Sequence, residues 1–332
     1  MEFSNVKKGD MTAKKYSHQQ REPCTFLLSN LCEREKVCIT VMEFNCSSTH
    51  KNDSFIILNR VAYTLVFILG LVLNSSALWC FKRTPQWTDT HIYMLNLLLA
   101  DFLLTLFLPF RIVETLCPMN LTKFCSFLIC VHYTNMYASI FTITTISVHR
   151  YLAVRFPIRN KSGGTSAVRR KKIAVLTCVL NWLLVIILCI TFSPNMKPEK
   201  LQTCYDRKDK EKLSIKFLLV LEILGYLLPM IIITTCSSQA IRAVLKSLKD
   251  IRRHAQEEII DKRKNIIAII TANMIVFIVC FTPVHTGYLL RYLFKEDTIR
   301  VFYHVSEWLA TTNCCLDSIG YYFLLKKVFR DN

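Results

Sequence analysis

The feature that most constrains this chain is a series of seven long apolar segments separated by short basic stretches. A bilayer core about 30 Å thick is crossed by about 20 helical residues, and each segment reaches that length. The segments lie at about 61–81, 92–113, 122–149, 173–193, 214–240, 265–290 and 301–325. Hydrophobic residues make up 52% of the 332 residues, which excludes a solvated, disordered chain. We therefore expect an all-α membrane protein, a seven-transmembrane helix bundle.

The distribution of Lys and Arg predicts the orientation of this bundle, because cytoplasmic loops carry the excess of these residues. With the amino terminus outside, 21 of them fall on the cytoplasmic side and 11 in the opposite loops. Three Asn-x-Ser/Thr sequons, at Asn45, Asn52 and Asn120, then all lie on the outer side, where glycosylation occurs. Most cations lie between the spans, so the net charge of +18 does not indicate a nucleic acid partner.

Polar sequence flanks the seven segments. Residues 1–54 are charged and unpatterned, and we expect a disordered extracellular tail before a transmembrane domain over 55–325. The first twenty residues lack the apolar stretch of a cleavable signal peptide, and Met42 is a candidate alternative start. In 326–332, the piece Lys326-Lys327-Val328-Phe329-Arg330 predicts a short amphipathic eighth helix along the inner membrane surface.

The fifteen cysteines do not indicate a metal site, because no CxxC pair or Cys/His spacing is present. Those within the spans are expected to be small packing residues, namely Cys80, Cys130, Cys178, Cys189, Cys236, Cys280, Cys314 and Cys315. Cys125, at the outer start of the third helix, and Cys204, in the second outer loop, both face an oxidising compartment. A disulfide between these two can tie the loop to the bundle.

Two carboxylates lie within the predicted spans, Asp101 in the second helix and Asp317 in the seventh. An uncompensated charge there is costly, and a cation bound between the two carboxylates would reconcile them. Sodium is the preferred occupant, with neutral oxygen ligands from Asn74, Asn135, Ser139 and Asn313. The alternative is a water-filled polar network with one carboxylate protonated. A proton relay would instead indicate a transporter.

A second polar group lies in the outer halves of the helices. Arg111 follows Pro109 by two residues near the outer end of the second helix, and Tyr133 and Tyr137 share a face of the third. The later helices add His285, Arg291 and Glu307. Because Arg pairs bidentately with phosphate or carboxylate, the group is typical of a site for a ligand with an acidic head. The alternative for Arg111 is an interhelical ion pair with Glu114 or Glu307.

The inner half of the bundle is typical of a two-state switch. Arg150 lies at the cytoplasmic end of the third helix, in the triplet His149-Arg150-Tyr151. Pro229 and Pro283 each remove a backbone hydrogen bond and bend the fifth and sixth helices. Glycine-rich phosphate loops and the HExxH and GxSxG motifs are missing, so we expect no enzymatic activity.

Taken together, these residues resemble the rhodopsin-like (class A) G-protein-coupled receptors over about 55–330. The matching pieces are Gly70-x-x-x-Asn74, Asn96-Leu-Leu-Leu-Ala-Asp101, Cys125 with Cys204, His149-Arg150-Tyr151, Trp182, Pro229, Phe277-x-x-Cys280-Phe281-x-Pro283 and Asp317-x-x-x-Tyr321. Leu108-Pro109-Phe110-Arg111 and Pro283-Val284-His285 add a likeness to one branch of that family. This branch holds receptors for lysophosphatidylinositol, lysophosphatidic acid and nucleotides, and a receptor associated with kynurenic acid.

The resemblance implies a plasma-membrane receptor for an extracellular anionic lipid similar to lysophosphatidylinositol. It implies coupling to a heterotrimeric G protein of the Rho-activating class, with arrestin a further candidate partner. A small aromatic acid or a nucleotide is the alternative ligand. A secondary transporter of an organic anion is the alternative from another class, although no duplicated hydropathy pattern supports it.

The same resemblance assigns roles to individual residues. The sodium site would consist of Asp101, Asn135, Ser139, Asn313 and Asp317, and no cofactor would be required. The inner switch would consist of Arg150, Tyr151, Phe281, Pro283 and Tyr321. Arg111 would contact the acidic head of the ligand.

Several features depart from the family's pattern: Ser318 replaces the usual proline after Asp317, and Phe281 stands where Trp is commoner. His149 stands where the family has Asp or Glu, which weakens the resting ion pair with Arg150 and predicts elevated basal signalling. The third outer loop, about 291–304, contains no cysteine. Cys46 is therefore expected to pair with Cys117 rather than with that loop.

Overall fold

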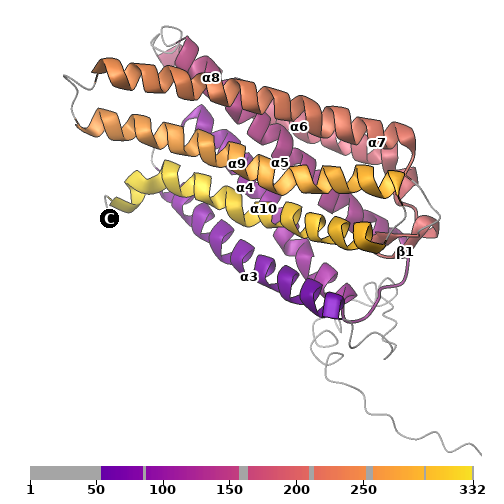
Figure 1. Cartoon of the computed structure of the whole chain (residues 1–332). Helices are drawn as coiled ribbons and strands as arrows, with labels where there is room; N and C mark the ends of the chain where they lie inside the picture. Colours follow the sequence, from indigo (N-terminus) through magenta and orange to yellow (C-terminus); the bar gives the residue numbers. More distant parts are fainter. Residues whose placement is uncertain are drawn as a thin grey trace, which may run out of the picture. The chain divides into compact units, whose positions relative to one another are not determined.

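The computed structural model describes residues 54–84, 87–156, 164–208, 213–251, 257–294 and 297–330. In these residues seven long helical rods form a bundle, which confirms the predicted fold class (Figure 1). The rods are α3 Ser54–Arg83, α4 Asp89–Glu114, α5 Lys123–Arg155, α6 Gly164–Phe192, the consecutive segments α7 Ile215–Glu222, η5 Ile223–Leu227 and α8 Leu228–Ile251, then α9 Glu257–Leu293 and α10 Asp297–Arg330. The expected amino-terminal tail and its sequons Asn45 and Asn52 lie outside the described residues, as does Met42.

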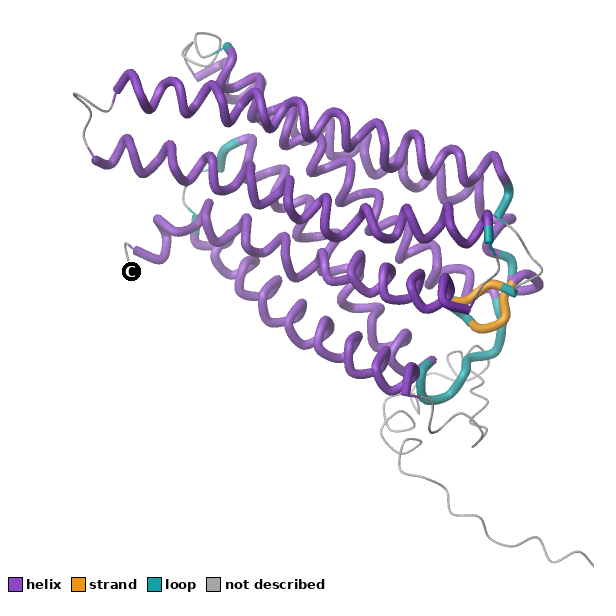
Figure 2. Tube along the Cα trace, viewed as in Figure 1, coloured by secondary structure: helices purple, strands orange, loops and turns teal. Residues whose placement is uncertain are grey.

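A small β-hairpin lies at one end of the bundle (Figure 2). It follows two short 3₁₀ helices, η3 Ser193–Met196 and η4 Pro198–Lys200, and consists of β1 Leu201–Thr203 and β2 Asp206–Arg207. The strands are antiparallel, with Leu201 opposite Arg207 and Thr203 opposite Asp206. We call this end of the bundle the hairpin end, and the opposite end, where α3 and α5 finish at Arg83 and Arg155, the basic end.

Six stretches of the described residues are long and apolar enough to cross a bilayer. They are Phe55–Arg83, Asp89–Glu114, Lys123–Arg155, Ala167–Met196, Ile215–Lys249 and Arg263–Leu293. The seventh rod, α10, is more polar because it carries Glu307, Asn313 and Asp317, all of which are buried against the other helices. Large apolar side chains cover the outer surface of the bundle; Leu176 and Ile190, for example, are exposed. A surface of this kind is suited to contact with lipid tails.

Hydrogen bonds between polar side chains fix the first helices against their neighbours. Asn96 of α4 donates to the Thr142 hydroxyl of α5 at 2.9 Å and accepts from the Trp182 indole of α6 at 2.8 Å. Asn74 of α3 donates to the backbone carbonyl of Cys314 in α10 at 3.0 Å. In an apolar medium such bonds also satisfy groups that have no water partner.

The fifth rod contains a π-helical turn, η5, which ends two residues before Pro229. Pro229 has no N–H to donate one turn back, and π turns are a common local response within long helices. Gly225 lies inside this turn and faces the Tyr137 ring of α5, two of whose carbons lie 3.1 and 3.2 Å from the place where a Cβ would stand. The close approach of the fifth rod to α5 therefore requires glycine.

The residues expected to form an eighth helix are helical in part. Lys326–Arg330 belongs to the last turns of α10, which is continuous from Asp297 to Arg330. Lys326–Arg330 are therefore helical, as a continuation of the seventh rod.

Candidate ligand-binding site

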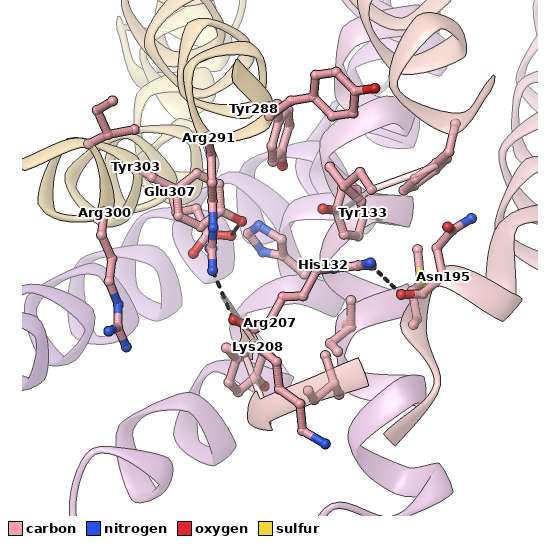
Figure 3. Close-up of a pocket in the computed structure, with 18 of the residues that line it drawn as sticks. His132, Tyr133, Asn195, Arg207, Lys208, Tyr288, Arg291, Arg300, Tyr303 and Glu307 are labelled. Atoms are coloured by element: carbon pink, nitrogen blue, oxygen red, sulfur yellow. Dashed lines mark hydrogen bonds between the residues drawn. The ribbon is translucent and has the colours of Figure 1, made fainter. Parts of the chain in front are cut away.

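A cavity of about 300 Å³ opens at the hairpin end between α4, α5, α9, α10 and the hairpin (Figure 3). Aromatic side chains from three helices form much of its wall, among them Tyr133, Tyr288 and Tyr303. Five cationic side chains also line it: Arg111, Arg207, Lys208, Arg291 and Arg300. Glu307 is the acidic side chain in the lining. The excess of cations over acids suits an anionic ligand.

The structure brings four of the six predicted ligand residues to this cavity. Arg111, Tyr133, Arg291 and Glu307 all line it. Tyr137 instead lines a second, adjoining cleft. His285 lines neither cavity; its ring stacks on Tyr226 at 4.7 Å, and its Nδ1 lies 3.3 Å from Glu222. His285 therefore packs between α9 and the fifth rod, behind the cavity walls, with its ring edge-on to Tyr288 at 5.6 Å and to Tyr137 at 6.0 Å.

The innermost charges of the cavity neutralise each other. Arg111 Nη2 donates to Glu307 Oε2 at 2.6 Å, and both side chains are less than a tenth exposed. The Tyr303 hydroxyl donates to the other Glu307 oxygen at 2.5 Å, and the Arg111 guanidinium lies over the rings of Tyr63 and Tyr205 at 4.4 and 4.6 Å. The ion pair weighed as the alternative for Arg111 is thus present, with Glu307 as its partner, although Arg111 also lines the cavity.

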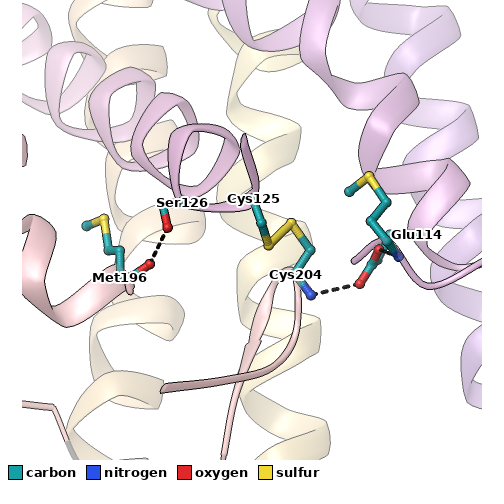
Figure 4. Close-up of a disulfide and its surroundings, with 6 residues drawn as sticks. Glu114, Cys125, Ser126, Met196 and Cys204 are labelled. Carbon is teal, nitrogen blue, oxygen red and sulfur yellow. Dashed lines mark hydrogen bonds between the residues drawn. A yellow bond between two sulfur atoms is a disulfide. The ribbon is translucent and has the colours of Figure 1, made fainter. Parts of the chain in front are cut away.

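Glu114, the other candidate partner of Arg111, has a different role in the structure (Figure 4). Its carboxylate accepts hydrogen bonds from the backbone N–H of Met119 at 2.6 Å and of Cys204 at 2.7 Å. The disulfide between Cys125 and Cys204 holds the same point of the hairpin against α5, with the two Cα atoms 5.3 Å apart. One wall of the cavity is therefore fixed by a covalent bond and by a half-buried carboxylate.

Three further cysteines are disulfide-bonded in the structure. The structure joins Cys130 of α5 to Cys189 of α6 by a disulfide, which corrects the expectation that both are isolated packing thiols. Cys117 is disulfide-bonded as well, and its expected partner Cys46 lies outside the described residues. The remaining cysteines expected to pack within the spans are free.

The mouth of the cavity contains a second set of charges. Asp206 of β2 is buried, and its two carboxylate oxygens lie 2.6 Å from Arg291 Nη2 and 2.7 Å from Arg300 Nη2. Arg291 also donates to the backbone carbonyl of Arg207 at 3.0 Å. Arg207 in turn donates to the backbone carbonyl of Asn195. Burial raises the pKa of the neighbouring Tyr205 phenol, against the opposing effect of Arg111, so this wall residue stays neutral.

An apolar cleft adjoins the cationic cavity and shares Tyr133, Met196 and Phe217 with it. It lies between α5, α6 and the fifth rod, and its other lining residues include Val185, Leu188, Leu221 and Leu224. Leu224 is exposed on the outer surface of the bundle. The cleft therefore leads from the cationic cavity toward the surface that faces lipid.

The predicted sodium ligands are all buried, Asn74 on α3 and the others on α4, α5 and α10. Asn313 donates to Asp317 at 2.8 Å one turn along α10. The Ser139 hydroxyl and the Asn313 side-chain oxygen have no hydrogen-bond partner among the described residues. Carboxylates and neutral amide and hydroxyl oxygens are ligand types that suit a hard cation such as sodium.

The predicted switch residues lie at the basic end and in α9. Phe281 is fully buried, one turn from Phe277, with the two ring centroids 5.5 Å apart, and Pro283 lies inside α9. Arg150 Nε and Nη2 have no hydrogen-bond partner among the described residues. Tyr151 lies next to it in the last turns of α5, and Tyr321 lies in α10, where the side chains are outside the description.

The His149 side chain contacts a carboxylate on another helix. Its Nε2 lies 2.9 Å from Asp89 in the first turn of α4, and Arg170 of α6 lies 3.7 Å from the same oxygen. Thr88 caps α4 and accepts from the His91 N–H, so the position of Asp89 is fixed by the start of the helix. Where the family has an acid next to Arg150, this chain has His149, and the carboxylate that contacts His149 comes from α4.

Comparison with known proteins agrees with this architecture. Residues 73–321 match the sequence profile of the family described as 7 transmembrane receptor (rhodopsin family). G-protein coupled receptor 55 of Homo sapiens is 33% identical over 303 residues, which cover 87% of this chain and 91% of that receptor. Lysophosphatidic acid receptor 4 of Mus musculus is 32% identical over 297 residues, covering 81% and 75%. G-protein coupled receptor 35 of Homo sapiens is 32% identical over 270 residues, covering 79% and 82%. Because the family profile spans most of the chain and the relatives align along most of its length, the chain belongs to the rhodopsin family of seven-transmembrane receptors.

Proposed function

We propose that this receptor binds an extracellular anionic lysophospholipid similar to lysophosphatidylinositol and activates a heterotrimeric G protein of the Rho-activating class. The observation that carries the proposal is the junction of two cavities with opposite chemistry at the hairpin end. One is cationic and aromatic, and the other is apolar and leads toward the lipid-facing surface.

The two parts of a lysophospholipid match these two cavities. Its phosphate would bind the cations of the larger cavity, because guanidinium groups pair bidentately with phosphate. Its acyl chain would pass Tyr133 and Phe217 and enter the apolar cleft, which has about 30 Å³ free in this structure and would have to widen to take it; burial of methylene groups there is favourable. A small aromatic acid or a nucleotide would use the cationic cavity alone.

The relatives and the charge pattern support the remaining parts of the proposal. The names of two relatives describe them as G-protein coupled, and a third is named as a receptor for lysophosphatidic acid. The Lys and Arg excess predicts that the basic end faces the cytoplasm, so the hairpin end, with the exposed sequon residue Asn120, would face outward. A ligand at the hairpin end and a G protein at the basic end would then act on opposite sides of the membrane.

The proposal can be tested with the full chain in lipid nanodiscs and an added Rho-activating G protein. Oleoyl-lysophosphatidylinositol is expected to stimulate guanine-nucleotide exchange, and kynurenate is the small-acid comparison. Leu188→Trp fills the apolar cleft and is expected to lower lysolipid potency about tenfold or more. Leu184→Trp is the matched control, because it changes an exposed residue one turn away on the same helix.

Each contrary outcome identifies a different alternative. Stimulation by kynurenate alone, unaffected by Leu188→Trp, would indicate a receptor for small acids. Uptake of the lysolipid into proteoliposomes without nucleotide exchange would indicate a transporter.

We also propose that sodium binds at Asp101, Asn135, Ser139, Asn313 and Asp317 as an allosteric ligand. The buried donor set described above supports this assignment. Replacing sodium by choline at constant ionic strength is expected to lower the melting temperature of the unliganded receptor. Asp101→Asn is expected to remove that difference, because it removes half of the anionic charge of the site. A sodium effect of the same size in parent and variant would contradict the assignment.

A further inference from the structure

Asp206 has the position that a bound anion would have at the mouth of the cavity. Its side chain is 5% exposed, and its two oxygens accept from two arginines on different helices, Arg291 of α9 and Arg300 of α10. His304 lies 3.9 Å from one of these oxygens. Two guanidinium groups that converge on one small anion form the arrangement in which arginines bind phosphate or carboxylate.

The two arginines remain accessible from the cavity even though Asp206 is buried. Arg291 and Arg300 both line the cavity, and their side chains are 23% and 40% exposed. At the inner end, by contrast, Arg111 is closed in with Glu307. An incoming anion therefore reaches the mouth arginines first, and it meets them already paired.

Asp206 also joins three parts of the bundle. It lies two residues after Cys204, whose disulfide to Cys125 attaches the hairpin to α5. Through Arg291 and Arg300 the same hairpin holds the ends of α9 and α10. An anion that replaced Asp206 would therefore release α9 and α10 from a hairpin that stays attached to α5.

We propose that Arg291 and Arg300 form the anion-binding subsite of this receptor and that Asp206 occupies it as a built-in competitor. The proposal rests on the proposed function, namely that the cavity binds an anionic ligand. The ligand group is a phosphate or carboxylate, and its binding requires that Asp206 leave the two arginines.

This arrangement has a definite thermodynamic consequence. When the binding-competent form is only a fraction of the population, the apparent affinity of every ligand falls by that same fraction. Removal of the competing charge should therefore strengthen the binding of all anionic ligands by a common factor. A neutral ligand that uses only the apolar cleft should show no change. By reciprocity, an anionic ligand should loosen the hairpin.

The test compares the parent with Asp206→Asn, as full chains in nanodiscs, by equilibrium binding of three lipids with the same acyl chain. The lipids are oleoyl-lysophosphatidylinositol, oleoyl-lysophosphatidic acid and oleoylglycerol. Asp206→Asn is expected to tighten binding of both anionic lipids about tenfold and to leave oleoylglycerol unchanged. Glu199→Gln is the matched control, because it makes the same change of charge at an exposed residue of the same loop.

A second measurement uses the parent alone and does not depend on how well the variant folds. Oleoyl-lysophosphatidic acid is expected to accelerate amide hydrogen exchange over residues 201–207. Oleoylglycerol is expected to leave that exchange unchanged.

The outcomes separate this inference from the proposed function. Unchanged or weaker binding of both anionic lipids to Asp206→Asn, or slower exchange of the hairpin on binding, would overturn the role of Asp206 alone. An equal gain of affinity for the anionic lipids in Glu199→Gln would do the same, because it would show that the effect comes from the net charge of the loop and not from Asp206 itself. Failure of both anionic lipids to bind either protein would overturn the proposed function, and this inference with it.

Discussion

At the scale of single residues, Arg111 and Glu307 depend on each other. Both are buried, and the 2.6 Å contact compensates two charges that are largely removed from water. Arg111→Gln leaves the Glu307 carboxylate without its cation, which is expected to destabilise the receptor by about 3–5 kcal/mol. The double variant Arg111→Gln with Glu307→Gln should lose much less. Thermal unfolding in detergent measures both changes, with Arg60→Gln, a partly exposed cation at the hairpin end, as the control.

The double variant also tests whether Arg111 contacts the ligand. If Arg111 binds the lysolipid phosphate as well as pairing with Glu307, the double variant should still bind lysolipid weakly although its stability is restored. Full recovery of binding together with stability would remove Arg111 from the ligand site. Equal stability of the single and double variants would contradict the mutual dependence of the pair.

At the scale of elements, the contact between the fifth rod and α5 depends on Gly225. A methyl group there would overlap the Tyr137 ring, so Gly225→Ala is expected to destabilise the receptor by about 1–3 kcal/mol. Gly287 of α9 is the matched control, because a Cβ there would meet its nearest neighbour, a Tyr303 carbon, at an ordinary contact distance of 3.4 Å. Gly287→Ala should be neutral or stabilising by up to about 1 kcal/mol. Equal melting temperatures for the two variants would contradict this account.

The helices could be predicted from the sequence where hydropathy alone marks them. The expected span 61–81 lies inside α3, and 265–290 lies inside α9, because apolarity marks the membrane-embedded part while helical hydrogen bonds continue beyond it. The hairpin was not predicted, since its strands contain three and two residues and carry no alternation. The π turn was not predicted either, because it depends on the packing of the fifth rod against Tyr137.

The candidate site was predictable in part, for a related reason. Arg111 and Glu307 were identified because a charge inside a span is unusual wherever it points. Tyr288 and Tyr303 were missed because a single tyrosine in an apolar helix shows its direction only after the helices pack. Asp206 was missed because its importance depends on two arginines that lie 85 and 94 residues away.

At the scale of the whole molecule, the resting state depends on how the basic end is held. His149 lies 2.9 Å from Asp89, and this contact joins α5 to α4 while leaving Arg150 without an acid on its own helix. His149→Asp supplies that acid, but it also places a carboxylate against Asp89. The informative variant is therefore His149→Asp combined with Asp89→Asn, and Asp89→Asn alone is its control.

The double variant is expected to lower ligand-free nucleotide exchange several-fold relative to Asp89→Asn. An ion pair at Arg150 worth about 1 kcal/mol shifts a two-state equilibrium by roughly fivefold. Exchange on added G protein, measured without lipid, reports this shift directly. The parent has His149 where the family has an acid, and its ligand-free nucleotide exchange is expected to be faster than that of the double variant. If the double variant exchanged as fast as Asp89→Asn, the acid at this position would not control the resting state, and the high basal rate would need another cause.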